Sequence, residues 1–331
     1  VKGKISFGQP TVVMEKSKLI NRLQGDAFLN DITITEDELV TTLKPGDEIE
    51  IIGDEDYFSF NTARLTNIVI SDLEGFNQKI TVNYQQCTAE KIVLMIRSDL
   101  NRGESIVIKN IPVADIYETG GDIFLEYNFK NKKCELTEHN NIRIIDLSLE
   151  IAKDQEFLRD VSNLNGTFSL GELSVNIKGQ GKLFDKGKRL ELSLPEESAD
   201  WTNINKVNIF PSGRYSISQK NSRTVVLTLN EDIYNEETIY INNLSIRPTV
   251  KEFINELLKI TAVEDTNVFA KSSNSITYSY PSLRSGANQV FFTDDTSWKI
   301  YNIDINTRDL NNTIFPGSKI SILLSNNSVS W

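Results

Sequence analysis

The side chains that could carry enzyme chemistry in this sequence begin with a single histidine. His139 lies in the polar run 137–141. A Ser/His/Asp or Cys/His catalytic arrangement would have to use it, because such sites need an imidazole base beside the nucleophile. A polar turn is the usual setting of a solvated histidine, and one histidine also excludes a His-rich transition-metal site within one chain. Since neither a P-loop nor a dinucleotide glycine fingerprint occurs, we expect a non-enzymatic protein without an organic cofactor.

Carboxylates are the most abundant reactive groups, with 46 Asp and Glu against 35 Lys and Arg and a net charge of −11. Such a chain repels phosphate backbones, so we expect no nucleic-acid partner. Paired carboxylates can hydrolyse glycosides, but no acid here recurs in an apolar setting that would tune its pKa. Acid-rich turns instead offer the oxygen ligands that calcium accepts, at an isolated or interdomain site. The candidate calcium ligands are Asp54, Glu55, Asp56, Asp294 and Asp295.

Aromatic side chains gather toward the end of the chain, at Tyr278, Tyr280, Trp298 and Tyr301. If exposed, they would form a platform for a sugar, and Trp298 and Tyr301 are the candidate ligand-binding residues. Cross-strand packing is the alternative, and it suits Tyr278 and Tyr280 because they are two residues apart.

Cys87 and Cys134 are the only cysteines, and both lie in polar, turn-like stretches. Two thiols so far apart match neither a zinc pattern nor a CxxC redox motif. A disulfide in an exported protein and two unpaired thiols both remain open.

The elements that must position these groups read as strands. Apolar residues alternate at 49–51, 106–108, 190–194 and 239–241, and Gly, Pro, Asn and Asp separate the runs. Two stretches, 152–161 and 250–259, are instead expected to form short helices. Short strands divided by turns indicate β-sandwiches rather than βαβ units.

The ends of the sequence give two further expectations. No apolar run approaches the roughly 18 residues that cross a bilayer. The chain begins in mature-looking sequence without a signal peptide, so we expect a processed or excised part of a longer precursor.

The sequence also repeats itself. Segment 29–34 recurs at 170–175 and again at 300–305. A second block, 92–111, recurs at 225–244. The offsets of the first block bring three turn glycines into register, where a tight turn often needs positive φ. They are Gly46, Gly187 and Gly317.

About two and a half copies of one unit are therefore expected, with boundaries at 1–116, 117–248 and 249–331. A frame that divides the chain near residues 61 and 202 fits nearly as well. The last copy lacks the second block. Either the chain is excised from a longer array, or another chain completes the open sheet edge by donating a strand.

The first copy carries a motif with a family likeness. Asp-Ile-Thr-Ile-Thr-Glu-Asp at 31–37, followed by Leu-Lys-Pro-Gly-Asp-Glu-Ile-Glu-Ile at 43–51, resembles repeats in exported bacterial cell-surface and S-layer-type proteins. In those repeats a Leu-Pro pair and then an aromatic residue often follow, and only the middle copy keeps them, at Leu194-Pro195 and Trp201. The resemblance implies tandem Ig-like β-sandwich domains and an extracellular, cell-surface location. It implies no catalytic residues.

These observations lead to two predicted functions. The first is a structural surface protein, such as an S-layer or stalk segment, whose partners are other copies or neighbouring repeats. The alternative is an adhesin or carbohydrate-binding module that contacts cell-wall or host glycans. An enzyme would need a pocket of converging polar groups, and neither the single histidine nor the scattered acids predict one.

Overall fold

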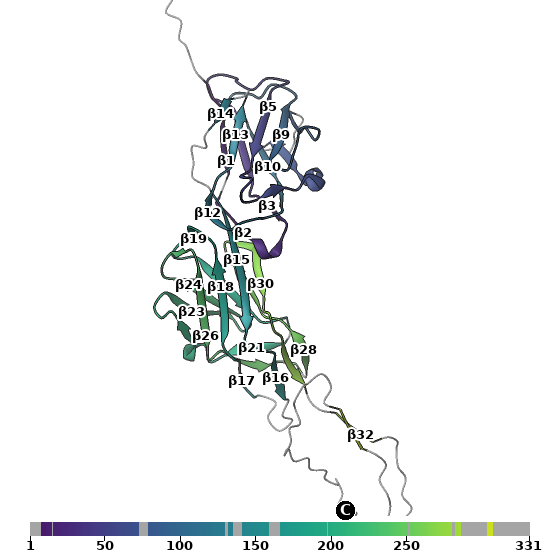
Figure 1. Cartoon of the computed structure of the whole chain (residues 1–331), viewed down its shortest axis with the longest axis vertical. Helices are drawn as coiled ribbons and strands as arrows, with labels where there is room; N and C mark the ends of the chain where they lie inside the picture. Colours follow the sequence, from purple (N-terminus) through teal and green to yellow (C-terminus); the bar gives the residue numbers. More distant parts are fainter. Residues whose placement is uncertain are drawn as a thin grey trace, which may run out of the picture.

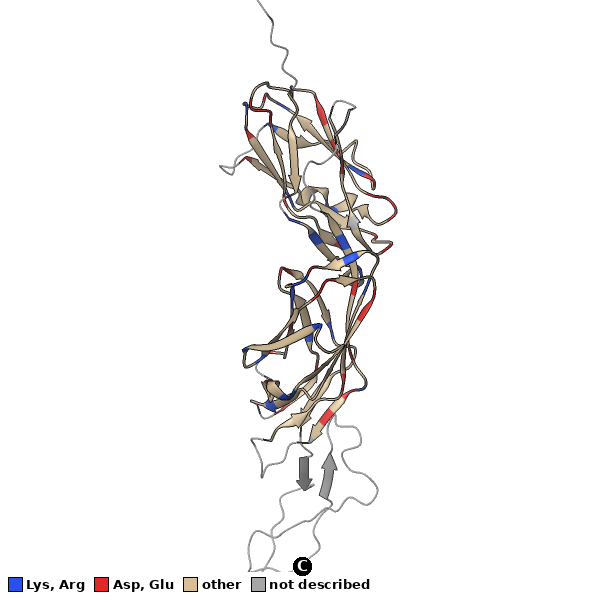
Figure 2. Ribbon diagram, turned by 90° about the vertical axis from the view of Figure 1, so that its left-hand side faces the viewer, with Lys and Arg blue, Asp and Glu red and all other residues tan. Residues whose placement is uncertain are grey.

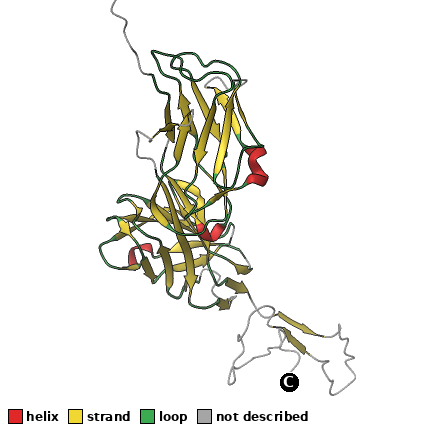
Figure 3. Ribbon diagram, turned by 45° about the horizontal axis from the view of Figure 1, so that its top comes forward, coloured by secondary structure: helices red, strands yellow, loops and turns green. Residues whose placement is uncertain are grey.

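A computed structural model of the chain describes residues 8–14, 16–72, 79–129, 132–134, 141–158, 166–196, 198–250, 252–279, 282–285 and 303–306. Nearly all of the regular secondary structure in these residues is β-strand, which confirms the predicted all-β class (Figure 3). The helices of the described residues are three short 3-10 helices, η1 (Arg22–Gln24), η2 (Thr62–Asn67) and η3 (Ile204–Lys206). Two β-sandwiches follow one another along the long axis of the molecule (Figure 1).

The first sandwich is built from short antiparallel strands. They are β1 (Thr11–Met14), β3 (Ala27–Phe28), β4 (Ile32–Thr35), β5 (Glu48–Ile52), β6 (Ser59–Phe60), β7 (Val69–Asp72), β8 (Ile80–Val82), β9 (Lys91–Ile96), β10 (Ser105–Lys109), β11 (Pro112–Ala114), β13 (Glu126–Phe129) and β14 (Lys132–Cys134). Two sheets, β1-β4-β10-β7 and β14-β13-β5-β9-β8, supply most of one buried core, and β3-β11-β6 forms a small third sheet. Ile32 and Ile34 enter this core while Thr33 and Thr35 do not, because successive side chains of a strand alternate between faces.

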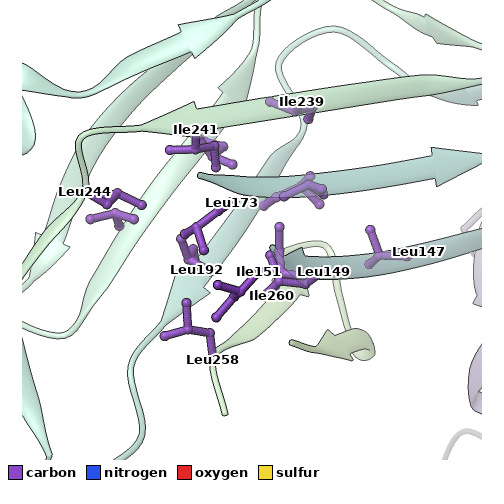
Figure 4. Packing of buried hydrophobic residues seen from close by; sticks show 14 of the residues in the cluster. Leu147, Leu149, Ile151, Leu173, Leu192, Ile239, Ile241, Leu244, Leu258 and Ile260 are labelled. Carbon is purple, nitrogen blue, oxygen red and sulfur yellow. The ribbon is translucent and has the colours of Figure 1, made fainter. Parts of the chain in front are cut away.

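The second sandwich uses the same kind of strand. They are β15 (Ile142–Ile151), β16 (Gln155–Leu158), β17 (Phe168–Ser169), β18 (Leu173–Lys178), β19 (Lys182–Phe184), β20 (Arg189–Ser193), β21 (Ala199–Thr202), β22 (Asn208–Phe210), β23 (Tyr215–Asn221), β24 (Thr224–Leu229), β25 (Ile233–Tyr234), β26 (Glu237–Asn242), β27 (Ser245–Pro248), β28 (Phe253–Glu256), β29 (Lys259–Ala262), β30 (Asp265–Lys271) and β31 (Ile276–Ser279). Its two main sheets are β15-β18-β26-β22 and β23-β24-β20-β29-β30. Aliphatic side chains from both sheets pack between them (Figure 4).

Both sandwiches pair their strands in the same order. The sheet β1-β4-β10-β7 corresponds to β15-β18-β26-β22, and β14-β13-β5-β9-β8 corresponds to β30-β29-β20-β24-β23. The small sheet β3-β11-β6 likewise corresponds to β17-β27-β21. The two repeated sequence blocks supply β4, β9 and β10 of the first sandwich and β18, β24 and β26 of the second. Equivalent residues of these strands pair in the same register in both sandwiches.

Gly46 and Gly187 take equivalent places in this plan. Their φ angles are +89° and +85°, a region that costs glycine little and other residues more. Gly46 N donates to Ile96 O at 2.9 Å, and Gly187 N donates to Leu229 O at 2.8 Å. Each glycine thus turns the chain into a strand and fixes that strand beside its partner. Gly317 lies outside the described residues.

The sandwiches extend beyond the boundaries expected from sequence. β13 and β14 pair with the first sandwich past residue 116, and β29 and β30 pair with the second past residue 248. These strands fall outside the repeated blocks, so the repeat alone could not assign them. Farther along, β32 (Ser282–Ser285) pairs antiparallel with β33 (Ile303–Asn306), which holds the place of β4 and β18 in the repeat.

The two expected helices are wrong over their described residues. Stretch 152–161 contains β16, and stretch 250–259 contains β28 and the start of β29. β31 pairs in parallel with β16 and antiparallel with β28. These backbone hydrogen bonds with a distant strand outweigh a weak local helical period.

Candidate functional site

Several polar bonds join the two sandwiches where they meet, and we take this region as the candidate site. Its centre is β15, a strand of ten residues that belongs to both units. Its first half pairs in parallel with β2 (Lys18–Asn21) and antiparallel with β12 (Gly120–Ile123). Its second half pairs with β18 of the second sandwich. One continuous strand therefore crosses from one sandwich to the other (Figure 1).

The side chains of β15 pass from one core to the other at a single step. Ile142 and Ile144 belong to the core of the first sandwich. Ile145, Leu147 and the alternate residues beyond them belong to the core of the second. Neighbouring residues of a strand point to opposite faces, so Ile144 and Ile145 can be fully buried in different cores. The two cores are thus joined without an intervening linker.

Asn21, at the end of β2, ties the first sandwich to both sheets of the second. Its side chain is buried, and its Nδ2 donates to Leu147 O at 3.1 Å and to Phe269 O at 2.9 Å. Its Oδ1 accepts from Leu147 N at 3.0 Å and from Leu23 N at 3.2 Å. The last bond also caps η1. One amide therefore satisfies backbone groups of β15, β30 and η1 together.

Two ion pairs flank Asn21. Lys18 Nζ lies 2.7 Å from Asp265 Oδ2, and their side chains are only 6% and 15% exposed. Arg22 holds Asp146 with two bonds, Nε to Oδ1 at 2.8 Å and Nη2 to Oδ2 at 2.5 Å. The hydrogen bond to Asp146 raises the pKa of Arg22. A bidentate pair fixes direction as well as distance, so this contact restrains rotation between the sandwiches.

Gln24 completes the joint. Its Nε2 donates to Asn267 O at 2.9 Å and its Oε1 accepts from Phe269 N at 3.1 Å. A cleft of about 210 Å³ lies beside these residues, lined by β2, η1 and part of β30. Several Lys and Arg residues lie where the sandwiches meet (Figure 2), and two of them, Lys18 and Arg22, are paired there with Asp265 and Asp146. In this arrangement the polar groups of one sandwich find hydrogen-bond and ion-pair partners on the other. Its effect is to hold the two sandwiches in one orientation.

The residues predicted from sequence as a calcium site are not brought together over the described chain. Asp54, Glu55 and Asp56 occupy the turn between β5 and β6, where Asp54 Oδ1 accepts from Asp56 N at 3.2 Å. Asp294 and Asp295 lie outside the described residues. No group of three or more His, Cys, Asp or Glu suited to a metal ion occurs within the described ranges. Calcium binding stays a prediction.

The predicted aromatic platform falls mostly beyond the described part of the chain. Trp298, Tyr301 and Tyr280 lie outside it. Tyr278 is buried between Phe168 and Phe253, with ring centroids 5.5 and 5.8 Å away. The packing interpretation of Tyr278 is therefore the one that the structure supports.

The other singled-out residues can be placed in part. His139 lies outside the described residues. Cys87 carries a free thiol whose Sγ accepts from Val93 N at 3.3 Å, and burial raises its pKa. The backbone of Cys134 lies in β14.

Sequence reasoning missed the joint altogether. Arg22 and Asp146 are 124 residues apart, and nothing in the sequence near either residue indicates that they pair. The one available hint was the run 142–151, which is longer than the other strands and breaks its alternation at Ile144 and Ile145.

No protein-family model and no curated protein matches the sequence. Solved structures similar to the chain include the C-terminal domain of the antigen I/II-family protein AspA from Streptococcus pyogenes, with a TM-score of 0.33 and 10% identity over 83% of this chain and 100% of that one. The collagen adhesin of S. aureus has a TM-score of 0.24 and 11% identity, over 82% of this chain and 92% of that one. The seventh ScaB type I cohesin of Pseudobacteroides cellulosolvens has a TM-score of 0.24 and 9% identity, over 44% of this chain and 99% of that one. TM-scores this low carry no argument for function.

Among the described residues, no helix has the length and apolar character needed to span a membrane.

Proposed function

We propose that this chain is a rigid, non-enzymatic segment of an extracellular adhesin-type surface protein, in which two β-sandwiches are held end to end. The observation that carries the proposal is β15, which runs unbroken from the core of the first sandwich into the core of the second. A segment built this way keeps a fixed direction, which is what a surface protein needs to present a binding face away from its anchor. The surface location rests on the sequence resemblance to exported repeats.

The bonds around β15 support this function further. Asn21, Lys18 and Arg22 all join the first sandwich to the second, and two of these three contacts are buried. Buried polar contacts are costly to leave half-made, so rotation at the joint would expose or strand several groups at once. A hinge would instead use a short, exposed linker with few contacts across it.

The S-layer interpretation of the sequence requires contacts between copies of the chain. The described residues offer no observation that favours such contacts, so we place the adhesin-type function first. Lattice formation stays a prediction.

The test is a distance distribution between the sandwiches. Nitroxide labels on Leu39→Cys and Tyr234→Cys, in a Cys87→Ser and Cys134→Ser background, sit at positions that are 70% and 55% exposed. We expect one narrow distance distribution for the otherwise unaltered chain. Asn21→Ala should broaden it, because the variant leaves backbone groups of β15 and β30 without their partner.

Asn230→Ala is the matched control, since Asn230 Nδ2 bonds Gly213 O inside the second sandwich. It should leave the distribution narrow. A broad distribution for the chain with intact Asn21 would overturn the proposal.

A further inference from the structure

The outer face of the sheet β15-β18-β26-β22 carries an ordered grid of side chains. The strand register places Ser148, Asn176 and Thr238 in one row across β15, β18 and β26. The next row on the same face, two residues farther along β18 and β26, contains Ser174, Tyr240 and Phe210. All point away from the core, because their neighbours Val175, Ile239 and Ile241 are buried. Polar and aromatic groups therefore lie side by side on one surface.

The aromatic part of this face is exposed without a structural need. Phe210 is 62% exposed and Tyr240 is 37% exposed. They are direct cross-strand partners, with ring centroids 6.4 Å apart and planes at 42°. Phe210 lies on β22, the last strand of the sheet, and Tyr240 lies on the neighbouring strand β26. Two adjacent rings left partly in water contribute less to folding than buried ones. An exposed pair of adjacent rings offers a surface on which another molecule can pack.

The polar part is held in a fixed orientation. Thr238 Oγ1 donates to Asn176 Oδ1 at 3.0 Å, and Asn176 Nδ2 donates to Ser148 Oγ at 3.4 Å. A carboxamide has two N–H groups and two acceptor sites, so Asn176 keeps one of each for a ligand. A shallow depression of about 460 Å³ lies over this row. Leu23 of η1, from the first sandwich, lines the depression, so the joint helps to shape it.

The charges around the depression favour an uncharged ligand. Asp146 is paired with Arg22, and Glu236 lies 3.1 Å from Lys178. Glu150 adds a further carboxylate to the lining. An anionic sugar or a nucleic acid would meet these three carboxylates, and a cationic ligand would have to compete with the cations that already neutralise two of them.

We propose that this face binds a neutral oligosaccharide. One sugar ring stacks its C–H face on Tyr240 and Phe210, while hydroxyl groups of the next sugar pair with Asn176 and Thr238. Sugars offer apolar C–H faces beside dense hydroxyl groups, and an aromatic row beside an amide and hydroxyl row matches that alternation. The assignment rests on the proposed adhesin-type function, because it names the ligand class of such a protein. The four residues that would contact the sugar, Tyr240, Phe210, Asn176 and Thr238, all lie on the second sandwich, so their role can be tested separately from the rigidity of the joint.

The experiment measures binding of the full chain to chitotetraose, cellotetraose, mannotetraose and a neutral glycan array, by calorimetry or array fluorescence. We expect at least one of these neutral glycans to bind. Tyr240→Ala and Phe210→Ala should each weaken that binding about tenfold or more, and Asn176→Ala should weaken it as well. A tenfold change corresponds to about 1.4 kcal/mol.

Tyr84→Ala is the matched control, because Tyr84 is 54% exposed but lies on the first sandwich. It should leave binding unchanged. Circular dichroism and thermal melts should match the unaltered chain for every variant, since the substituted side chains lie on the surface.

Three outcomes would overturn the proposal: no neutral glycan binds, only anionic glycans or proteins bind, or binding survives the Tyr240 and Phe210 substitutions. The distance measurement at the joint separates this result from the proposed function. If the unaltered chain binds no neutral glycan but gives a narrow distribution of distances between the labels, only the ligand assignment is refuted. If it binds a neutral glycan but gives a broad distribution, only the rigid segment is refuted.

Discussion

Val107 of the first sandwich and Tyr240 of the second occupy the same position in corresponding strands. Val107 stands opposite Thr33 on one side and Ser71 on the other, whereas Tyr240 stands opposite Ser174 and Phe210.

The exposure of the two residues differs as well. Val107 is 8% exposed and Tyr240 is 37% exposed. The valine–serine pair of the first unit is thus replaced by two exposed rings in the second. The strand order is unchanged, so recognition can be altered on an outer face without disturbing the pairing that builds the fold.

The inner faces of the two sandwiches show the opposite behaviour. Ile49 and Ile51 of β5 correspond to Leu190 and Leu192 of β20, and all four are fully buried. Each pair stands opposite the repeated apolar strand of its own unit. Close packing restrains these positions, because a change of even one methylene group is felt in a core. The comparison therefore separates residues that maintain the fold from residues that are free to acquire a ligand.

The largest effect should come from the contact that joins the two units. Lys18→Met removes one partner of a buried pair and leaves Asp265, 15% exposed, without its cation. Breaking such a pair costs about 3 kcal/mol of unfolding free energy, and it should make the two sandwiches unfold in separate transitions. Calorimetry and urea denaturation would measure both effects.

Lys220→Met is the control for this substitution. Lys220 lies 2.7 Å from Glu191, but its side chain is 55% exposed and both residues are in the second sandwich. An exposed pair contributes about 0–1 kcal/mol. If both variants lost the same stability, the joint would not be the special contact that we describe.

Substitution of the two turn glycines should lower the unfolding free energy by an intermediate amount, and the loss should be equal in both sandwiches. Gly46→Ala and Gly187→Ala place a side chain at φ near +90°, where nothing lies within 4 Å of the added carbon. The cost is therefore backbone strain alone, about 1–2 kcal/mol for each variant. Chemical denaturation with tryptophan and tyrosine fluorescence would give both values. A large difference between them would show that the two turns are not equivalent.

These comparisons also show what could be read from sequence. The strands at 49–51 and 190–194 were predictable, because a buried face imposes alternation on neighbouring residues. Their glycines were predictable because a turn with positive φ selects glycine. The joint was not predictable, since the partners of Asn21 are backbone atoms of Leu147 and Phe269, which leave no trace in residue type.

The aromatic face lies between these two cases. Tyr240 stands between two isoleucines, so the alternation of side chains along a strand predicts that it points away from the core. Its partner Phe210 could not, because the register of β22 against β26 follows from the turns that precede it. The sequence instead suggested Trp298 and Tyr301 as ligand residues, which lie outside the described residues, and packing for Tyr278, which is buried.

The smallest effect concerns acid stability at one equivalent position of the two sandwiches, Asp185 in the second and Lys44 in the first. Asp185 lies 2.7 Å from Arg143 and 2.8 Å from Lys182. Burial opposes its ionisation, but hydrogen bonds from these two cations outweigh burial and lower its pKa to about 2. The corresponding residue of the first sandwich is Lys44, whose contact with Asp99 at 3.7 Å is largely exposed.

A carboxylate whose pKa is lower in the folded state stabilises the protein above its unfolded pKa, about 3.9, and loses that contribution as the pH falls toward 2. The Asp185 side chain is 38% exposed, so solvent screening limits the effect to less than about 1 kcal/mol. Asp185→Asn should therefore lower the melting temperature slightly at neutral pH and flatten its decline between about pH 4 and pH 2. Lys44→Met should change neither the melting temperature nor its decline with pH, and an equal flattening by both variants would mean that Asp185 is not the source of the difference.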